Sequence, residues 1–409
     1  MTETEKTKEN ANQKVPGQLS DNMIMLLIAL IASFPPLSTD LYLPALPTMS
    51  EQLGCSVAWV TSSIYVFFIF MSTSSFIWGP VSDKYGRRPI LMIGVPLFII
   101  SSIFCVLSSN VYQLIAARIF QAIGAGSAMA VNLAIVKDVF PGKKRERTIA
   151  IATVLNGVIP VVAPTLGSQI INYFTWRGTF GLLVIAGLVV WIFVFFLKET
   201  NREFSGVSTF ETTARLFVVL KNPHFTQLLI VFSLISIPLL GFISVSSFIF
   251  VKRFGLSTEA YGFYFGIIAL HFVIGGPIYL FLQRFFKPVN IITVCYFGSL
   301  ASGILMLTIG QSDPICFAAA IAAGYLSTSI SRPPSSSLLL EQQDKDTGSA
   351  SSLIQASFVL TGSLGMVFIS FDWSNRILVL GIMNLILSTA GLLLWIYTKA
   401  RCRIPKHFQ

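Results

Sequence analysis

The chain has 409 residues, of which 54% are hydrophobic and only 11% are charged. A soluble globular protein carries about 25% charged residues, so this composition, with a mean hydropathy of +0.75, excludes a soluble domain and predicts a polytopic membrane protein. The formal net charge is +10, but the basic residues lie in short runs between apolar segments. They therefore indicate topology in a membrane and not nucleic-acid binding. The five cysteines are scattered without metal-ligand spacing, so neither a metal site nor a disulfide framework is expected.

Apolar segments of about 20 residues or more predict membrane-spanning helices. There are twelve such segments in chain order: 23–46, 58–80, 90–108, 111–139, 149–173, 178–197, 227–251, 260–283, 289–310, 314–338, 350–371 and 376–398. An even number of spans places both termini on one side, and the basic residues in the tails and in the connectors on that side predict that it is cytoplasmic. The first residues are polar and lack a cleavage site, so the first span is expected to be retained.

The longest polar connector, 198–226, divides the chain into two halves. We expect a cytoplasmic tail (1–22), an N-terminal six-helix bundle (23–197), a central cytoplasmic linker (198–226), a C-terminal six-helix bundle (227–398) and a cytoplasmic tail (399–409). The halves resemble each other weakly, because a Gly-Pro pair followed by bases and a second Pro comes after both span two and span eight. This pattern predicts an all-α transporter built from two bundles as parallel repeats.

The stretch GPVSDKYGRRPIL (79–91) joins spans two and three. We expect the second helix to end at Gly79 and Pro80, a tight turn at Tyr85 and Gly86, and the third helix to begin at about Pro89. The stretch resembles the signature of the major facilitator superfamily, with its Gly, Asp and Arg residues at the family positions. Four further stretches resemble the Bcr/CflA branch of proton-coupled drug efflux transporters: STDLYLPALP (38–47), RIFQAIGAGSAMAVNLAIVKDVF (118–140), IPVVAPTLGS (159–168) and WRGTF (176–180).

Asp40 is the main ionisable residue of the first span, and no base is adjacent to it. An ionised group inside a membrane helix costs roughly 2.5–3.5 kcal/mol or more, so such a residue normally faces a cavity or a partner. We therefore predict that Asp40 binds the coupling proton; the alternative is that it lies in periplasmic water near Pro44 and Pro47, which end the helix.

Arg118 is the only base of the fourth span apart from Lys137 at its cytoplasmic end. From the rise of 1.5 Å per residue, Asp40 lies about 26 Å, Gln121 about 27 Å and Arg118 about 32 Å from the cytoplasmic edge. Arg118, Gln121 and Ala125 share one helical face and could point together into a central cavity. The resemblance implies that Arg118 assists proton transfer; the alternative is that it only extends to the periplasmic surface.

The resemblance also implies a cytoplasmic latch between the two halves. In it Asp83 faces the N-terminal end of span eleven, where the helix dipole favours an anion, and Arg87 bridges to Asp138. The alternative is that these charges only set the topology. The span-five residues Gly157, Pro160, Pro164 and Gly167 match the motif associated with antiporters, and they predict a bent, tightly packed helix.

Aromatic residues on helices that line the cavity in this fold are candidate substrate contacts, although ordinary packing is the favoured explanation for any single one. They are Tyr42, Tyr65, Phe68, Phe242 and Phe250, together with the amide of Gln121. His271 in span eight is either a hydrogen-bonded interior residue or a second protonation site. Arg332, Pro333 and Pro334 are expected to terminate or kink span ten.

The resemblance implies a proton-coupled transporter of the inner membrane that exports amphipathic or apolar drugs by alternating access. It would use the proton gradient and no cofactor, and it is expected to act as a monomer with a small-molecule substrate and protons. Alternatives are an exporter of an endogenous metabolite or siderophore, a proton symporter, and, less favoured, a channel or receptor. An enzyme is not expected, because no cluster of His, Asp and Glu and no nucleophile motif is present.

Overall fold

The computed structural model describes residues 19–201, 216–343 and 347–401, and every regular element in these ranges is helical. Within them, eleven helical stretches are long and apolar enough to cross a membrane. The longest, α7 (Gly142–Phe196), contains a break at Thr175, where φ is 59° and ψ is −175°. Each part of α7 is long enough to span a bilayer on its own, so the described residues make the twelve crossings that hydropathy predicts.

The first half of the chain contributes six of these crossings, and the helix bounds mostly follow the apolar segments. The elements are α2 (Asp21–Asp40), η1 (Leu43–Ala45), α3 (Leu46–Gln52), α4 (Val57–Tyr85), α5 (Arg87–Leu107), α6 (Val111–Val139) and α7. α6 has the predicted bounds because the Asn110 side chain caps its first turn by accepting from the N–H of Gln113. The first span differs, because α2 ends at Asp40, six residues earlier than predicted.

The second half contributes the other six crossings. Its elements are α9 (Pro223–Ser233), α10 (Ser236–Ser247), η2 (Phe248–Arg253), α11 (Thr258–Leu282), α12 (Pro288–Thr308), α13 (Pro314–Leu340), α14 (Thr347–Ile369) and α15 (Arg376–Arg401). The seventh span is therefore not one regular helix, since it breaks between α9 and α10 and ends in a π-helical turn. α13 does not terminate at Arg332, Pro333 and Pro334, as one alternative for this span expected, but continues to Leu340.

The stretch 79–91 is also more helical than the sequence suggests. α4 continues through Gly79 and Pro80 to Tyr85, and α5 begins at Arg87, so the expected loop is reduced to Gly86 alone. A proline removes one backbone hydrogen bond but does not end a membrane helix when neighbouring elements support it. The prediction that the helix ends at Gly79 and that the next begins at about Pro89 is therefore wrong.

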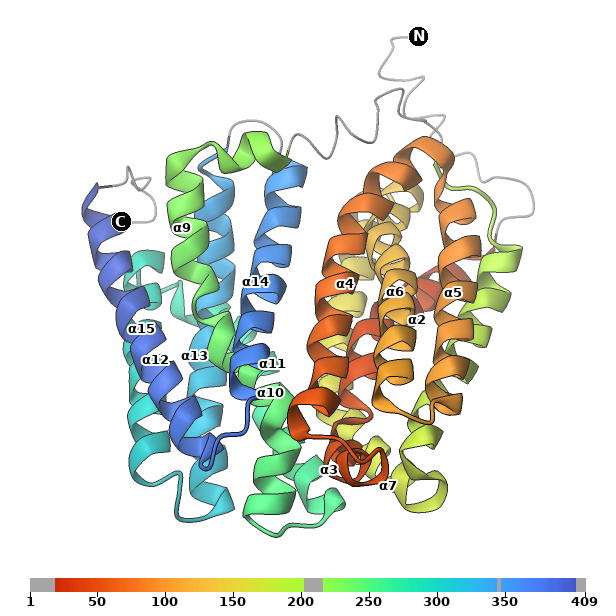
Figure 1. Cartoon of the computed structure of the whole chain (residues 1–409). Helices are drawn as coiled ribbons and strands as arrows, with labels where there is room; N and C mark the ends of the chain where they lie inside the picture. The colour runs from red at the N-terminus through yellow and green to blue at the C-terminus, as the bar shows by residue number, and fades with distance from the viewer. Residues whose placement is uncertain (1–18, 202–215, 344–346, 402–409) are drawn as a thin grey trace.

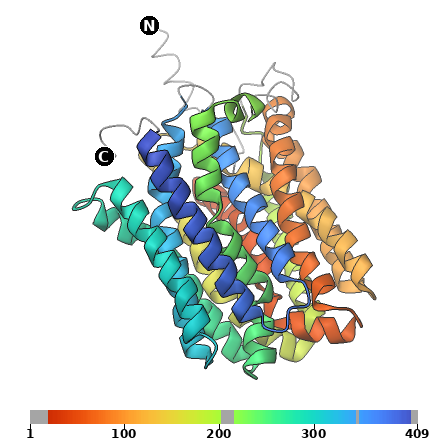
Figure 2. The same ribbon diagram turned by 60° about the vertical axis from the view of Figure 1, so that its left-hand side comes forward.

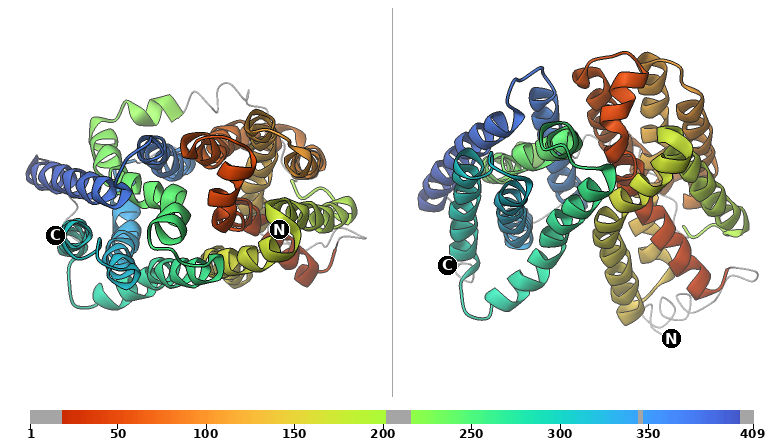
Figure 3. Two further views of the ribbon diagram at one scale, coloured as in Figure 1. Left: turned by 60° about the horizontal axis from the view of Figure 1, so that its bottom comes forward. Right: turned by 90° about the horizontal axis from the view of Figure 1, so that it is seen from below.

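The helices form two bundles that stand next to each other (Figure 1), one made of α2 to α7 and the other of α9 to α15. Within each bundle the spans run across the molecule side by side, as the turned view in Figure 2 shows. The bundles meet along two pairs of helices, α4 with α14 and α7 with α11 (Figure 3). We call the side on which α2 begins and α15 ends the terminal side, and the other the opposite side.

Candidate functional site

Asp40 is the last residue of α2, at the point where the chain turns into η1. Its side chain is only 5% exposed, and its one hydrogen-bond partner in the described chain is the hydroxyl of Thr39, at 3.0 Å. The turn arises because Pro44 lies in η1, directly after the end of α2. Asp40 is thus a buried carboxyl group that no basic side chain of the described residues neutralises.

Arg118 is fully buried inside the N-terminal bundle. Its Nε donates to the backbone carbonyl of Ser63 at 3.1 Å, and its Nη1 donates to Oε1 of Gln121 at 2.5 Å. The Gln121 amide in turn donates to the hydroxyl of Ser102 at 2.7 Å. The guanidinium carbon lies 4.1 Å from the ring centroid of Phe67, and Nη2 has no hydrogen-bond partner. The structure therefore holds a positive charge by amide, carbonyl and ring contacts, without an ion pair among the described residues.

Asp40 and Arg118 lie in different surroundings despite their similar predicted depth. Arg118 interacts with Tyr42, whose ring centroid is 5.0 Å from the guanidinium carbon. Asp40 comes directly before the turn into η1, and η1 contacts α10 and α11 of the C-terminal bundle. Depth along a helix does not determine the direction in which a side chain points, so sequence could place these residues at one level but could not pair them. Asp40 faces the interface between the bundles, and Arg118 lies within one of them.

The predicted latch residues lie on the terminal side. Arg87 is 7% exposed, and it forms ion pairs with Asp83 at 2.5 Å and with Asp138 at 3.1 Å. In the described part of the chain the Asp83 carboxylate bonds only to Arg87 and does not reach the start of α14. All three charges therefore belong to the N-terminal bundle in this conformation, and they tie α4, α5 and α6 together.

Glu199, which sequence reasoning missed, holds the start of α5. Its carboxylate accepts hydrogen bonds from the backbone N–H groups of Arg87 at 2.8 Å and of Arg88 at 3.1 Å. The first N–H groups of a helix lack partners within it and carry a partial positive charge, so a carboxylate satisfies both requirements. Gly86 is needed beside it, because its φ is 103° and a Cβ there would collide with the Glu199 carboxylate. The sequence feature that could have indicated this role is the position of Glu199 as an acidic residue just after the sixth span.

The antiporter-motif glycines of α7 pack closely against neighbouring parts of the chain. A Cβ at Gly167 would collide with the backbone carbonyl of Leu41, next to Asp40, and Gly157 packs against Val273 of α11. On the α11 side, Gly262 and Gly266 allow the α7 backbone to come close. Their Gly-x-x-x-Gly spacing was a readable signal that the sequence analysis did not use. Pro160 and Pro164 do not end α7.

The candidate substrate contacts divide into two groups. Tyr65 and Phe68 on α4 are half-buried, whereas Tyr42 is buried and bonds the hydroxyl of Ser63 at 3.0 Å. Phe242 and Phe250 are completely buried in an aromatic cluster of the C-terminal bundle, where both pack against Phe317. Of the six candidates, the two on α4 are therefore the most accessible.

Two polar contacts join the bundles on the opposite side. Lys252 of η2 forms an ion pair with Glu51 of α3, and the Asn172 amide of α7 donates to Glu259 of α11 at 2.5 Å. The interface between the bundles is thus reinforced by polar contacts far from the Arg87 cluster.

His271, on the same helix as Glu259, is half-buried, and its Nδ1 lies 2.8 Å from the carbonyl oxygen of Ile267.

The fold and sequence together assign the chain to a class. Residues 28–366 match the family model of the Major Facilitator Superfamily, and the chain belongs to this family. The structure is similar to the crystal structure of a D-xylose-proton symporter, with a TM-score of 0.75 at 15% sequence identity, over 94% of this chain and 98% of that one. The protein is therefore a multi-pass membrane transporter of small molecules, and it is not an enzyme.

Two curated relatives are more similar in sequence. The uncharacterized MFS-type transporter YdgK of Bacillus subtilis is 29% identical over 355 residues, which cover 83% of this chain and 87% of that protein. The multidrug resistance protein MdtL of Escherichia coli O157:H7 is 28% identical over 284 residues, covering 68% of this chain and 71% of MdtL. Drug efflux is therefore suggested by a distant relative.

Proposed function

We propose that this protein is a proton-coupled efflux transporter of the Bcr/CflA type, which exports amphipathic or apolar compounds in exchange for protons. The observation that carries the proposal is the Asp40 carboxyl group, buried at the interface between the bundles with no base paired to it in the described chain. Burial without a counter-ion favours the neutral form of a carboxyl group. Such a group can take up a proton and release it when its surroundings open to water.

Arg118 couples proton and substrate occupancy through charge. Asp40 and Arg118 are not paired in this conformation, so the coupling requires a second conformation. In that conformation an ionised Asp40 would offset the charge of Arg118, and protonation of Asp40 would leave Arg118 uncompensated. Substrate and proton then bind with different affinities to the same site region, and coupling of this kind is reciprocal. Gln121 positions Arg118, because their 2.5 Å hydrogen bond fixes the guanidinium against Ser63 and Phe67.

Alternating access occurs by rocking of the two bundles, 23–197 and 227–398, about the packed contacts of α7 with α11 and α4 with α14. With the termini in the cytoplasm, as the basic residues predict, the terminal side faces inward. The bundles are joined by Lys252 and Glu51 on the opposite side, while Asp83 does not contact α14 in the described chain. These contacts support an inward-facing conformation, in which the latch of Asp83 with the start of α14 forms only on outward opening.

The relationship to MdtL supports the drug substrate class, as do the half-buried aromatic residues Tyr65 and Phe68 on α4. A pocket lined by aromatic and apolar groups with few charges adapts to many amphipathic molecules. We propose that the chain works as a monomer in the inner membrane and needs no cofactor beyond the proton gradient.

The test is transport by Asp40→Asn in proteoliposomes with an imposed pH gradient, with a panel of neutral and anionic amphipathic dyes as probes. Asn has the size of Asp but does not titrate. We expect the variant to bind the probes and to equilibrate them, but to lose gradient-driven accumulation. Drug susceptibility of cells that express the wild type or Asp40→Asn provides a second measurement.

Asp313→Asn is the matched control. Asp313 caps α13 by accepting from the N–H groups of Ile315 and Cys316, and Asn caps helices equally well, so full coupled transport is expected. Normal gradient-driven accumulation by Asp40→Asn would contradict the proposal. In the wild type, fast dye flux that is equal with and without the pH gradient would indicate a channel. Dye movement by the wild type in the same direction as the protons would indicate a symporter. Identical susceptibility of wild-type and empty-vector cells would favour an endogenous metabolite.

A further inference from the structure

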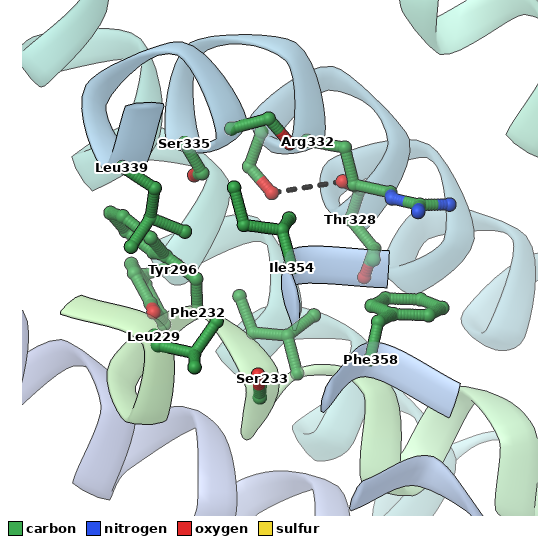
Figure 4. A pocket seen from close by; sticks show the side chains of 13 residues that line it. Leu229, Phe232, Ser233, Tyr296, Thr328, Arg332, Ser335, Leu339, Ile354 and Phe358 are labelled. Atoms are coloured by element: carbon green, nitrogen blue, oxygen red, sulfur yellow. Dashed lines mark hydrogen bonds between the residues drawn. The ribbon is translucent and has the colours of Figure 1, made fainter. Parts of the chain in front are cut away.

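A cavity opens in the terminal-side half of the C-terminal bundle, between α9, α12, α13 and α14 (Figure 4). The space available inside it is about 30 Å³, whereas a single water needs roughly 10–15 Å³ of such space. The cavity can therefore hold a small polar group but not a whole drug molecule. Its lining combines the aromatic rings of Phe232, Tyr296 and Phe358 with an arginine and several hydroxyl groups.

Arg332 is the charged residue of this lining. It lies eight residues before the end of α13 at Leu340, about 12 Å along the helix axis. Its guanidinium carbon is 4.1 Å from the ring centroid of Phe358 and 5.8 Å from that of Phe272. In the described part of the chain it has no acidic partner and donates no hydrogen bond. A cation at this depth normally has a counter-ion or a carbonyl partner, and here ring contacts alone hold it.

Three hydroxyl groups around the cavity have no partner either. Ser233, Thr328 and Ser335 are buried, and within the described residues their side-chain oxygens make no hydrogen bond. Many serine and threonine hydroxyls in the described chain bond to a carbonyl three or four residues earlier, as Ser331 does with Thr328 at 2.9 Å. These oxygens line the cavity and are accessible from it, so they are available to bond a ligand or water.

We propose that this cavity binds the carboxylate of a transported compound, with Arg332 as its cationic partner and the hydroxyls of Thr328 and Ser335 as hydrogen-bond donors. A guanidinium group presents a planar fork that matches a carboxylate. The rings of Phe232, Tyr296 and Phe358 line the cavity itself, so they would pack around the carboxylate end of the molecule, and its apolar part would extend beyond the cavity. This inference narrows the substrate class to amphipathic compounds with an anionic group. Its claim that the bound compound is transported rests on the proposed function.

The position of the cavity agrees with loading by an exporter. It lies on the terminal side, which faces the cytoplasm in the proposed orientation, and the polar contacts between the bundles lie on the opposite side. Arg118 and Arg332 are both buried or half-buried cations without an acid partner in the described chain. Of the acids at the interface, Glu51 and Glu259 each have a polar partner on the other bundle, which leaves Asp40 as an acid without a paired base among the described residues. This excess of positive charge favours an anion over a cation as cargo.

The experiment measures equilibrium binding of radiolabelled benzoate and of its neutral analogue benzamide to the purified full-length protein in phosphatidylcholine nanodiscs, without a pH gradient. We expect the wild type to bind benzoate more tightly than benzamide. Arg332→Gln should weaken benzoate binding by about tenfold or more and leave benzamide binding unchanged. The Thr328→Val, Ser335→Ala double variant keeps all charges and should weaken benzoate binding by a smaller factor.

Arg284→Gln is the control, because it removes the same charge from an exposed residue and should leave both affinities unchanged. Retained benzamide binding by Arg332→Gln shows that the variant is folded. Unchanged benzoate affinity in Arg332→Gln and the double variant, or no preference for benzoate in the wild type, would overturn the inference. A further arm uses nanodiscs that contain phosphatidylglycerol. Loss of the benzoate preference in these discs would indicate that the cavity binds a lipid headgroup, and it would overturn the inference that the cavity binds a transported compound. Because no gradient is used, the benzoate preference is measured independently of proton coupling, so its loss can be distinguished from a failure of gradient-driven transport.

Discussion

Removing the Glu199 carboxylate should release the start of α5. Glu199→Ala deletes the acceptor of the Arg87 and Arg88 backbone N–H groups, at 2.8 and 3.1 Å. A hydrogen bond to a charged group contributes about 1.5–3 kcal/mol. Because Glu199 is half-buried and water can replace part of each bond, we take the lower figure for both. The expected loss is about 3 kcal/mol of the free energy of unfolding.

The size of the resulting Tm shift depends on what unfolds together. Unfolding entropy is about 2.1 cal/mol/K per residue, so for the whole chain of 409 residues a loss of about 3 kcal/mol lowers Tm by about 3 °C. If the N-terminal bundle of roughly 180 residues unfolds separately, the same loss lowers Tm by about 8 °C. Glu199→Gln keeps one acceptor oxygen and should show about half of either shift.

The assay is thermal unfolding of the detergent-solubilised protein, followed by the fraction that remains monodisperse after heating. Glu146→Ala serves as the control, since Glu146 is exposed and has no side-chain partner in the described residues. A Tm for Glu199→Ala within 1 °C of both the wild type and Glu146→Ala, below the about 3 °C expected, would refute the argument that Glu199 stabilises α5.

Two further predictions concern the interface between the bundles. Gly266→Ala places a methyl group 2.7 Å from the Val161 carbonyl oxygen and should cost about 1–3 kcal/mol through overpacking, whereas Gly276→Ala meets open space and should be neutral; equal thermal stability and equal transport by the two variants would contradict this. Glu51→Lys replaces the attraction to Lys252 by repulsion. A loss of about 1 kcal/mol from this contact changes the ratio of the inward-facing to the outward-facing conformation by about fivefold. Spin-label distances across the opposite side should lengthen in Glu51→Lys and return in the Glu51→Lys, Lys252→Glu double variant; unchanged distances would show that the pair does not hold the bundles.

Some of the site could be predicted from the sequence because it depends on spacing within one helix. Arg118 and Gln121 are three residues apart, so a helix necessarily brings them to one face, and the structure shows them bonded at 2.5 Å. The ion pair of Arg87 with Asp138 at 3.1 Å followed from resemblance to a family whose loop has the same residues. The roles of these residues in coupling and gating remain predictions that the proposed experiments test.

Other features could not be predicted because they depend on how helices rotate and pack. Asp40 faces the C-terminal bundle and not Arg118, which follows from the turn after α2 and from the packing of Gly167 of α7 against Leu41. The two prolines that follow Arg332 in the sequence suggested that the helix ends there. In the structure α13 continues through both prolines, and the Arg332 guanidinium lies over the ring of Phe358.

Sequence alone determined the membrane class and the helical crossings, because apolar length and the positions of charges act locally along the chain. It also determined the bounds of α6, where a capping asparagine coincides with the start of an apolar segment. Only the tertiary structure decided that Glu199 caps α5, that Asp40 and Arg118 are separated, and that Arg332 lines a cavity with unpaired hydroxyls. These depend on contacts between residues far apart in the chain, and such contacts follow from the packing of whole helices against one another.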